Sequence, residues 1–166
     1  MKKIALLVIL TAFLGAACGH DTGNFLIMLT DAPIPDATAI IVDISSISVH
    51  ATGGAYQTVL TGSESIDLLQ LPGQERQIAS TELPQGSYTE IRLEVTGGRI
   101  VIGGNSYQMT VPSSEVKIPV AFEVTSSGTT RVVLDFDASE SIQVVHAGQN
   151  GGYILRPVIK LVMVSF

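Results

Sequence analysis

The chain has 166 residues, of which 46% are hydrophobic and 14% are charged, and its formal net charge is −6 at pH 7. This length fits one domain with a real hydrophobic core, and the apolar fraction excludes an intrinsically disordered chain. The acidic balance argues against a nucleic-acid-binding surface, and the single Cys excludes a disulfide framework or a zinc site built from several Cys residues.

Residues 1–17 predict an export signal. Lys2 and Lys3 form a positively charged start, and an apolar run of 11 residues follows over positions 4–14. Such a run suits the core of a signal peptide but is too short for a transmembrane helix, which needs about 20 residues. Removing this segment takes away both lysines and no acidic residue, so the net charge would change from −6 to −8.

The end of this segment, Leu14-Gly15-Ala16-Ala17-Cys18, resembles the lipobox of bacterial lipoproteins. In that family the Cys thiol receives a diacylglycerol and the chain is cleaved just before it, so the resemblance implies lipidation at Cys18 and a membrane anchor. An ordinary signal peptide cleaved at the same place is the alternative. The residue after the Cys is Gly19 rather than Asp, which in Gram-negative lipoproteins implies sorting to the outer membrane.

The remaining chain predicts a short tether over residues 18–24 and a single β domain over 25–166. Turn signals at Gly53-Gly54, Gly97-Gly98 and Gly103-Gly104 separate the strands, and a parity change at Ser45-Ser46 indicates a bulge. Residues 65–71 fit either one helical turn or a strand. Alternating or apolar strand patterns occur at 25–30, 39–50, 56–60, 90–95, 99–102, 106–111, 116–124, 130–136, 141–146 and 153–166.

We therefore expect an all-β fold, a Greek-key β-sandwich of immunoglobulin-like or prealbumin-like type with about 8–11 strands. Leu83, Gly86 and Tyr88 have the Leu-x-x-Gly-x-Tyr spacing of a tyrosine corner, in which the Tyr hydroxyl bonds back to nearby backbone. Tyr88 has the parity of the polar side of its strand, so this interpretation needs a bulge near Thr89. A plain Pro-Gly turn is the alternative.

Several segments together resemble an uncharacterised family of exported prokaryotic proteins, domain of unknown function 4382. The resemblance implies a lipoprotein β-sandwich and carries no chemistry. It covers roughly residues 25–164 and rests on five segments, which are Leu29-Thr30-Asp31-Ala32-Pro33, residues 66–71, residues 83–93, residues 134–142 and residues 153–159.

A calcium site is one chemical possibility. Asp135 and Asp137 lie two residues apart on a predicted strand, and Asp31 follows another strand. Calcium is bound by six to eight oxygen ligands, several of them carboxylates. The alternative is that these residues form turns and strand caps through hydrogen bonds to backbone. No other cofactor is expected.

Catalytic patterns are weak. Glu90 and Glu94 form a possible glycosidase pair, but they share a strand face with Arg92, which favours a solvated surface. His20, His50 and His146 stand singly, and no Gly-x-Ser-x-Gly motif supports a Ser-His-Asp triad.

We therefore expect a non-enzymatic, membrane-anchored lipoprotein of the cell envelope with an adhesion, scaffolding or binding role and an envelope protein or glycan as partner. A carbohydrate- or small-ligand-binding module is the alternative, with Tyr56, Tyr107 and Tyr153 as aromatic platforms, and a hydrolase is a more distant one. Arg156-Pro157 predicts that the last strand is bulged or lies at a sheet edge, where a partner segment can bind.

Overall fold

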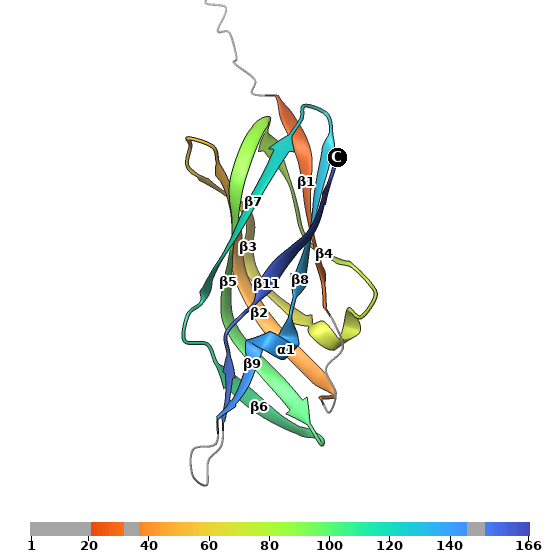
Figure 1. Ribbon diagram of the computed structural model, residues 1–166, viewed down its shortest axis with the longest axis vertical. Helices are drawn as coiled ribbons and strands as arrows, with labels where there is room; N and C mark the ends of the chain where they lie inside the picture. The colour runs from red at the N-terminus through yellow and green to blue at the C-terminus, as the bar shows by residue number, and fades with distance from the viewer. Residues whose placement is uncertain (1–20, 32–36, 146–151) are drawn as a thin grey trace, which may run out of the picture.

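The structure is a computed structural model that describes residues 21–31, 37–145 and 152–166. Its eleven described strands form two packed mixed β-sheets, so the protein is an all-β sandwich (Figure 1). The four-stranded sheet has the order β11 (Ile159–Ser165), β8 (Thr129–Phe136), β1 (Thr22–Thr30) and β4 (Arg76–Pro84).

The seven-stranded sheet contains the remaining strands, and its long central strand is β5. The order is β3 (Tyr56–Asp67), β2 (Ala39–Ala51), β5 (Gly86–Ile102), β6 (Asn105–Thr110), β10 (Gly152–Leu155) and β9 (Ile142–Val145), with β7 (Glu115–Val124) also paired to β5. The first half of β5 pairs with β7 and the second half with β6, while β2 runs along the opposite side of both halves. Two short helices, η1 (Leu68–Gln70) and α1 (Ala138–Ser141), complete the fold.

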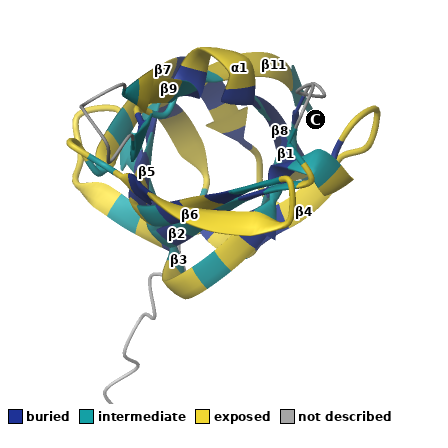
Figure 2. Ribbon diagram, turned by 90° about the horizontal axis from the view of Figure 1, so that it is seen from below, coloured by how far each residue is buried: buried dark blue, intermediate teal, exposed yellow. Residues whose placement is uncertain are grey.

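The hydrophobic core lies between the sheets because alternate residues of each strand point inward. Figure 2 shows buried segments on the inner surfaces and exposed segments on the outer ones. An aromatic stack joins the two layers. Phe122 of β7 stacks on Phe25 of β1, with ring centroids 5.0 Å apart, and on Tyr88 of β5, with centroids 5.1 Å apart. Both contacts add specific aromatic packing to the burial of large apolar surfaces.

The turn before β5 has the geometry of a tyrosine corner. The Tyr88 hydroxyl donates a hydrogen bond of 2.9 Å to the Pro84 carbonyl, and the Tyr88 side chain is buried. Gly86 has φ +155°, a conformation that L side chains rarely adopt. The register of β5 against β7 shifts between Tyr88 and Glu90. A bulge near Thr89 is what the tyrosine-corner interpretation predicted. The bulge turns Tyr88 inward to the same side as Ile91 and Leu93.

The three Gly pairs lie in two different kinds of structure, hairpin turns and the interior of a strand. Gly53 and the pair Gly103-Gly104 have positive φ and lie in hairpin turns, as predicted. The turn predicted at Gly97-Gly98 is wrong, because β5 runs through it without interruption. A Cβ on Gly98 would lie 2.8 Å from the Met109 side chain and 3.1 Å from the Ile41 carbonyl. These glycines therefore allow neighbouring groups to approach closely within the sheet.

Other boundaries differ from the sequence expectations. β1 begins at Thr22, within the predicted tether, and residues 76–84 form strand β4 where no strand was predicted. Residues 65–71 were expected to form either a strand or one helical turn. They form both, because β3 continues to Asp67 and the short helix η1 follows it. The expected strand over 153–166 is two strands in different sheets, separated at Arg156-Pro157. Proline has no backbone N–H to donate, so the chain leaves one ladder there and joins another.

Candidate functional site

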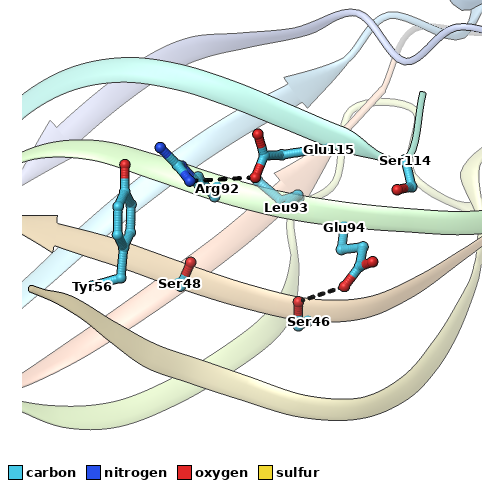
Figure 3. Close-up of a pocket in the computed structure, with 8 residues that line it drawn as sticks. All are labelled: Ser46, Ser48, Tyr56, Arg92, Leu93, Glu94, Ser114 and Glu115. Atoms are coloured by element: carbon cyan, nitrogen blue, oxygen red, sulfur yellow. Dashed lines mark hydrogen bonds and ion pairs between the residues drawn. The ribbon is translucent and has the colours of Figure 1, made fainter.

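A hollow of about 480 Å³ lies on the outer face of the seven-stranded sheet (Figure 3). Strands β2, β3, β5 and β7 meet there, and we call this hollow the outer groove. Its lining is rich in hydroxyl and charged groups and consists of Ser46, Ser48, Tyr56, Arg92, Leu93, Glu94, Ser114 and Glu115. The alternation of β5 explains this polarity, because Ile91, Leu93 and Val95 are buried while Glu90, Arg92 and Glu94 point outward.

Arg92 organises one side of the outer groove. Its Nε donates to Glu90 Oε1 at 2.6 Å, and its Nη1 donates to Glu115 Oε2 at 3.3 Å. Lys117 pairs with the other oxygen of Glu115 at 3.1 Å. Single exposed ion pairs contribute little to stability, but a connected network holds its side chains in fixed positions.

The Tyr56 side chain is 39% exposed, and its ring and hydroxyl have specific contacts with neighbouring groups. The Arg92 guanidinium carbon is 3.9 Å from the centroid of its ring, and the His50 ring centroid is 4.6 Å away. Its hydroxyl donates to Glu90 Oε1 at 2.6 Å. Cation–π attraction and a charge-assisted hydrogen bond therefore both hold the ring in place.

The hydrogen bonds of this cluster shift its ionisation. Hydrogen bonds from Tyr56 and Arg92 lower the pKa of Glu90 below its ordinary value. The same hydrogen bond to Glu90, followed by desolvation, raises the pKa of Tyr56. Glu90 is thus held as a carboxylate and Tyr56 as a neutral phenol. A general acid needs the opposite perturbation, a raised carboxyl pKa, so Glu90 is poorly suited to protonate a leaving group.

The possible glycosidase pair does not come together across a cleft. Glu90 and Glu94 are four residues apart on one strand, which is about 13 Å along an extended backbone and beyond the separation that either glycosidase mechanism uses. Glu94 accepts a hydrogen bond from Ser46 at 3.2 Å at the far end of the outer groove. His50, for its part, contacts Thr89 through Nδ1 at 3.2 Å, while His20 and His146 lie outside the described residues.

Two of the three predicted calcium ligands, Asp31 and Asp137, are engaged with other groups of the protein. Asp31 is buried and accepts a hydrogen bond from the Ala138 backbone N–H at 3.2 Å. Asp137 caps α1 by accepting from the Glu140 backbone N–H, and it also pairs with Lys160 at 2.9 Å. Across residues 21–31, 37–145 and 152–166, no group of three or more His, Cys, Asp or Glu side chains is arranged to hold a metal ion. The predicted three-carboxylate site is therefore not formed.

The pKa values in this region follow from the same contacts. The Lys160 hydrogen bond, with further hydrogen bonds from Ser139 and Glu140, lowers the pKa of Asp137 to about 2. Burial, together with the nearby charge of Asp137, raises the pKa of Asp135. The pKa values of two carboxyls only two residues apart are thus shifted in opposite directions, and Asp137, which caps α1, stays ionised.

The other two predicted platforms form a pair elsewhere. Tyr107 of β6 and Tyr153 of β10 have ring centroids 5.3 Å apart with a tilt of 51°. Strands β6 and β10 pair in parallel, which brings these residues together from 46 positions apart in the chain. The structure thus separates the predicted aromatic set into Tyr56 at the outer groove and a pair formed by Tyr107 and the partly buried Tyr153.

Sequence reasoning missed most of the outer groove. It treated Glu90, Arg92 and Glu94 as a solvated strand face. It named Ser46 only as part of a bulge, and it did not single out Ser48, Ser114 or Glu115. The alternation of the strand at 39–50 was a usable signal, since its polar positions face the same side as those of β5 once the strands pair. The predicted lipidation residue Cys18 lies outside the described residues. None of the described helices is long and apolar enough to cross a membrane.

Comparison with known proteins places most of the chain in one family. The model of the family described as "Domain of unknown function (DUF4382)" matches residues 22–157. Neither the search of curated proteins nor the search of solved structures returned a match. The matched range covers β1 through β10, which includes every strand that contributes to the outer groove.

Proposed function

The chain belongs to the DUF4382 family, whose description assigns no activity, and we propose that it is a lipid-anchored binding protein of the cell envelope. Its role is adhesion or scaffolding through a bound ligand rather than catalysis. The observation that carries this proposal is the outer groove, a preorganised polar hollow on a rigid sheet. Sites on rigid elements hold their side chains in place before the ligand arrives, which lowers the entropic cost of binding.

The anchor rests on the sequence from Leu14 to Cys18. A lipidated Cys18 would be followed by two residues, Gly19 and His20, before the described chain begins at Asp21, three positions after the anchor. β1 starts at the end of the sandwich where the C-terminus also lies (Figure 1). Three extended residues reach about 10 Å, so this end would face the membrane closely. Several acyl chains, each buried CH₂ contributing about 0.8 kcal/mol, hold a protein on a bilayer.

The anchor is tested by processing and sorting. In cells expressing the full chain, we expect a mature protein that begins at Cys18, carries acyl mass and sediments with membranes. Cys18→Ser should abolish the acyl mass and release the protein or leave it unprocessed. Gly19→Asp should move it from the outer to the inner membrane in a Gram-negative host. An unmodified mature protein in the soluble fraction would contradict the anchor.

The ligand that best fits the outer groove is a carbohydrate. Serine hydroxyls can donate and accept, Arg92 donates, and Glu94 and Glu115 accept, which matches the many hydroxyls of a sugar. Because Arg92 lies over the ring of Tyr56 and Glu90 accepts a hydrogen bond from its hydroxyl, recognition here relies mainly on hydrogen bonds rather than on ring stacking. Ordered side chains that need little rearrangement favour such polar recognition.

A glycan array tests the ligand class. The wild-type chain should bind a defined set of glycans, and Ser48→Trp should remove that binding by filling the outer groove. Ser80→Trp is the matched control, because Ser80 is an exposed serine on β4 of the other sheet. Equal loss with both variants, or no retained glycan with wild type, would contradict a carbohydrate ligand at this site.

A further inference from the structure

Strand β11 is an edge of the four-stranded sheet and carries an unusual number of exposed apolar side chains. Among the described residues it pairs with β8 on one side and with no strand on the other. Exposed large hydrophobic residues are concentrated here, with Leu161 41% exposed, Val162 57%, Met163 42% and the following Phe166 75%. A long apolar edge strand is a ready site for pairing with another chain.

The neighbouring edge strand β7 is built in the opposite way. Its outward positions carry Glu115, Lys117, Pro119 and Glu123, and Ala121 is its small exposed residue. Charged side chains and proline are the features that protect sheet edges from unwanted pairing. The same molecule therefore protects one edge and leaves the adjacent one apolar, which indicates that β11 is normally covered.

The apolar surface continues from β11 onto the outer face of its sheet. Met28 of β1, Val133 of β8 and Met163 of β11 are register partners in one row across the three strands. Val133 is 1% exposed, so its neighbours already bury it, while Met163 at the edge stays open. A partner on β11 would therefore extend an existing apolar row rather than start a new one.

We propose that β11 is the interface of a symmetric homodimer, in which two β11 strands meet antiparallel about a twofold axis near Val162 and Met163. The charges fit a second copy of this chain. Lys160 is the one charged residue of β11, and antiparallel pairing places it opposite Ser165 of the second copy. Two copies of an acidic chain repel at most contacts, but this segment has no acidic residue. A twofold contact needs one self-complementary patch, which the apolar centre of β11 supplies, while Lys160 at each end is already paired with Asp137 and Glu140 of its own chain.

Cysteine cross-linking in the full chain tests the dimer. Under an added oxidant, cells expressing Val162→Cys should give a disulfide-linked homodimer several-fold above wild type, which has Cys18 as its sole Cys. Ala121→Cys on β7 is the matched control and should stay at the wild-type level. A Val162→Cys band no stronger than the control, or a cross-link to a different protein, overturns the proposal.

A second variant keeps the test independent of disulfide geometry. Val162→Lys places a charge at the centre of the interface and should weaken self-association, measured by analytical ultracentrifugation of the purified full chain, about tenfold or more. Ala121→Lys should leave it unchanged. Because Val162 is already exposed in the single chain, Val162→Lys should lower the melting temperature only by the share that dimerisation contributes, and Ala121→Lys should melt at the same temperature as wild type. Unchanged association in Val162→Lys overturns the proposal.

Discussion

The two faces of strand β5 carry different chemistry within one stretch of sequence. On the inner face, Tyr88, Ile91 and Leu93 are almost fully buried, and Tyr88 stacks on Phe122. On the outer face, Glu90 and Arg92 lie among polar groups and are bound by hydrogen bonds. The inner residues are held by packing, which costs free energy to disturb, whereas the outer residues are held by contacts that water can replace. Substitutions on the two faces should therefore separate stability from binding.

The largest expected effect is at the inner face. Leu93→Ala removes a side chain that is 0% exposed and leaves a cavity between the sheets, so the free energy of unfolding should fall by about 2–5 kcal/mol. Urea denaturation measures this loss. Glu94→Ala, one residue further along the same strand, should change the free energy of unfolding by less than about 1 kcal/mol. A similar loss of unfolding free energy in both variants would contradict the proposed difference between the two faces of β5.

The turn that leads into β5 should give the next largest effect. Gly86 has φ +155°, and no atom lies within 4 Å of an added Cβ, so Gly86→Ala tests backbone strain alone. The free energy of unfolding should fall by about 1–3 kcal/mol.

Gly152→Ala is the matched control for that strain. A Cβ there also meets nothing within 4 Å, and no positive φ is found at this glycine. Its free energy of unfolding should stay level or rise by about 0.4–1 kcal/mol, because alanine restricts the unfolded chain. If Gly86→Ala is as stable as Gly152→Ala, the turn does not require glycine.

The two tyrosines provide a smaller, directly comparable test. Tyr88→Phe removes the hydroxyl that bonds to the Pro84 carbonyl and should cost about 1 kcal/mol of unfolding free energy. Tyr56→Phe removes a hydroxyl from a ring that is 39% exposed, where water can take its place, and should change stability less. Thermal melts of both variants decide this, and the reverse order would contradict the assignment of Tyr88 to a tyrosine corner.

The smallest effect is on ionisation at the outer face. The folded pKa of Glu90 lies below its ordinary value of 4.5, so its hydrogen bonds stabilise the fold above pH 4.5. That contribution is lost as the pH falls through the lower, folded pKa. NMR titration of the Glu90 carboxyl should show a midpoint below 4.5, and Tyr56→Phe should move the midpoint upward. Tyr107→Phe on β6 should leave it unchanged, and an unmoved midpoint in Tyr56→Phe would remove Tyr56 as the cause.

The Gly pairs show a limit of predicting turns from neighbouring residues in the sequence. Gly103-Gly104 and Gly97-Gly98 look alike in the sequence, yet the first is a hairpin turn and the second lies inside β5. What separates them is the approach of Met109 and Ile41 to Gly98, and both residues are distant in sequence. The split at Arg156-Pro157 is similar. Pro157 predicted that the last strand is interrupted. It did not predict that the part before it, β10, joins the seven-stranded sheet and the part after it, β11, joins the four-stranded sheet.

Local patterns in the sequence predict the class of fold and the inward residues of most strands. Alternation and turn residues are local properties, and a half-buried strand shows them before it has a partner. The spacing from Leu83 to Tyr88 likewise predicted a corner that its own neighbours complete. Strand β4 was missed because Ile78 and Ala79 are both buried, which breaks the alternation.

Which strands are neighbours depends instead on contacts between segments that are far apart in the chain. Pairing of β2, β3, β5 and β7 brings Ser46, Tyr56, Arg92 and Glu115 into one groove, and the end position of β11 leaves its apolar side chains open. Strand partners are chosen by contacts between distant segments, whose combined packing and hydrogen bonding no single segment encodes. The sequence therefore predicted a sandwich, while the location of its binding groove and its apolar edge followed from the order of the strands.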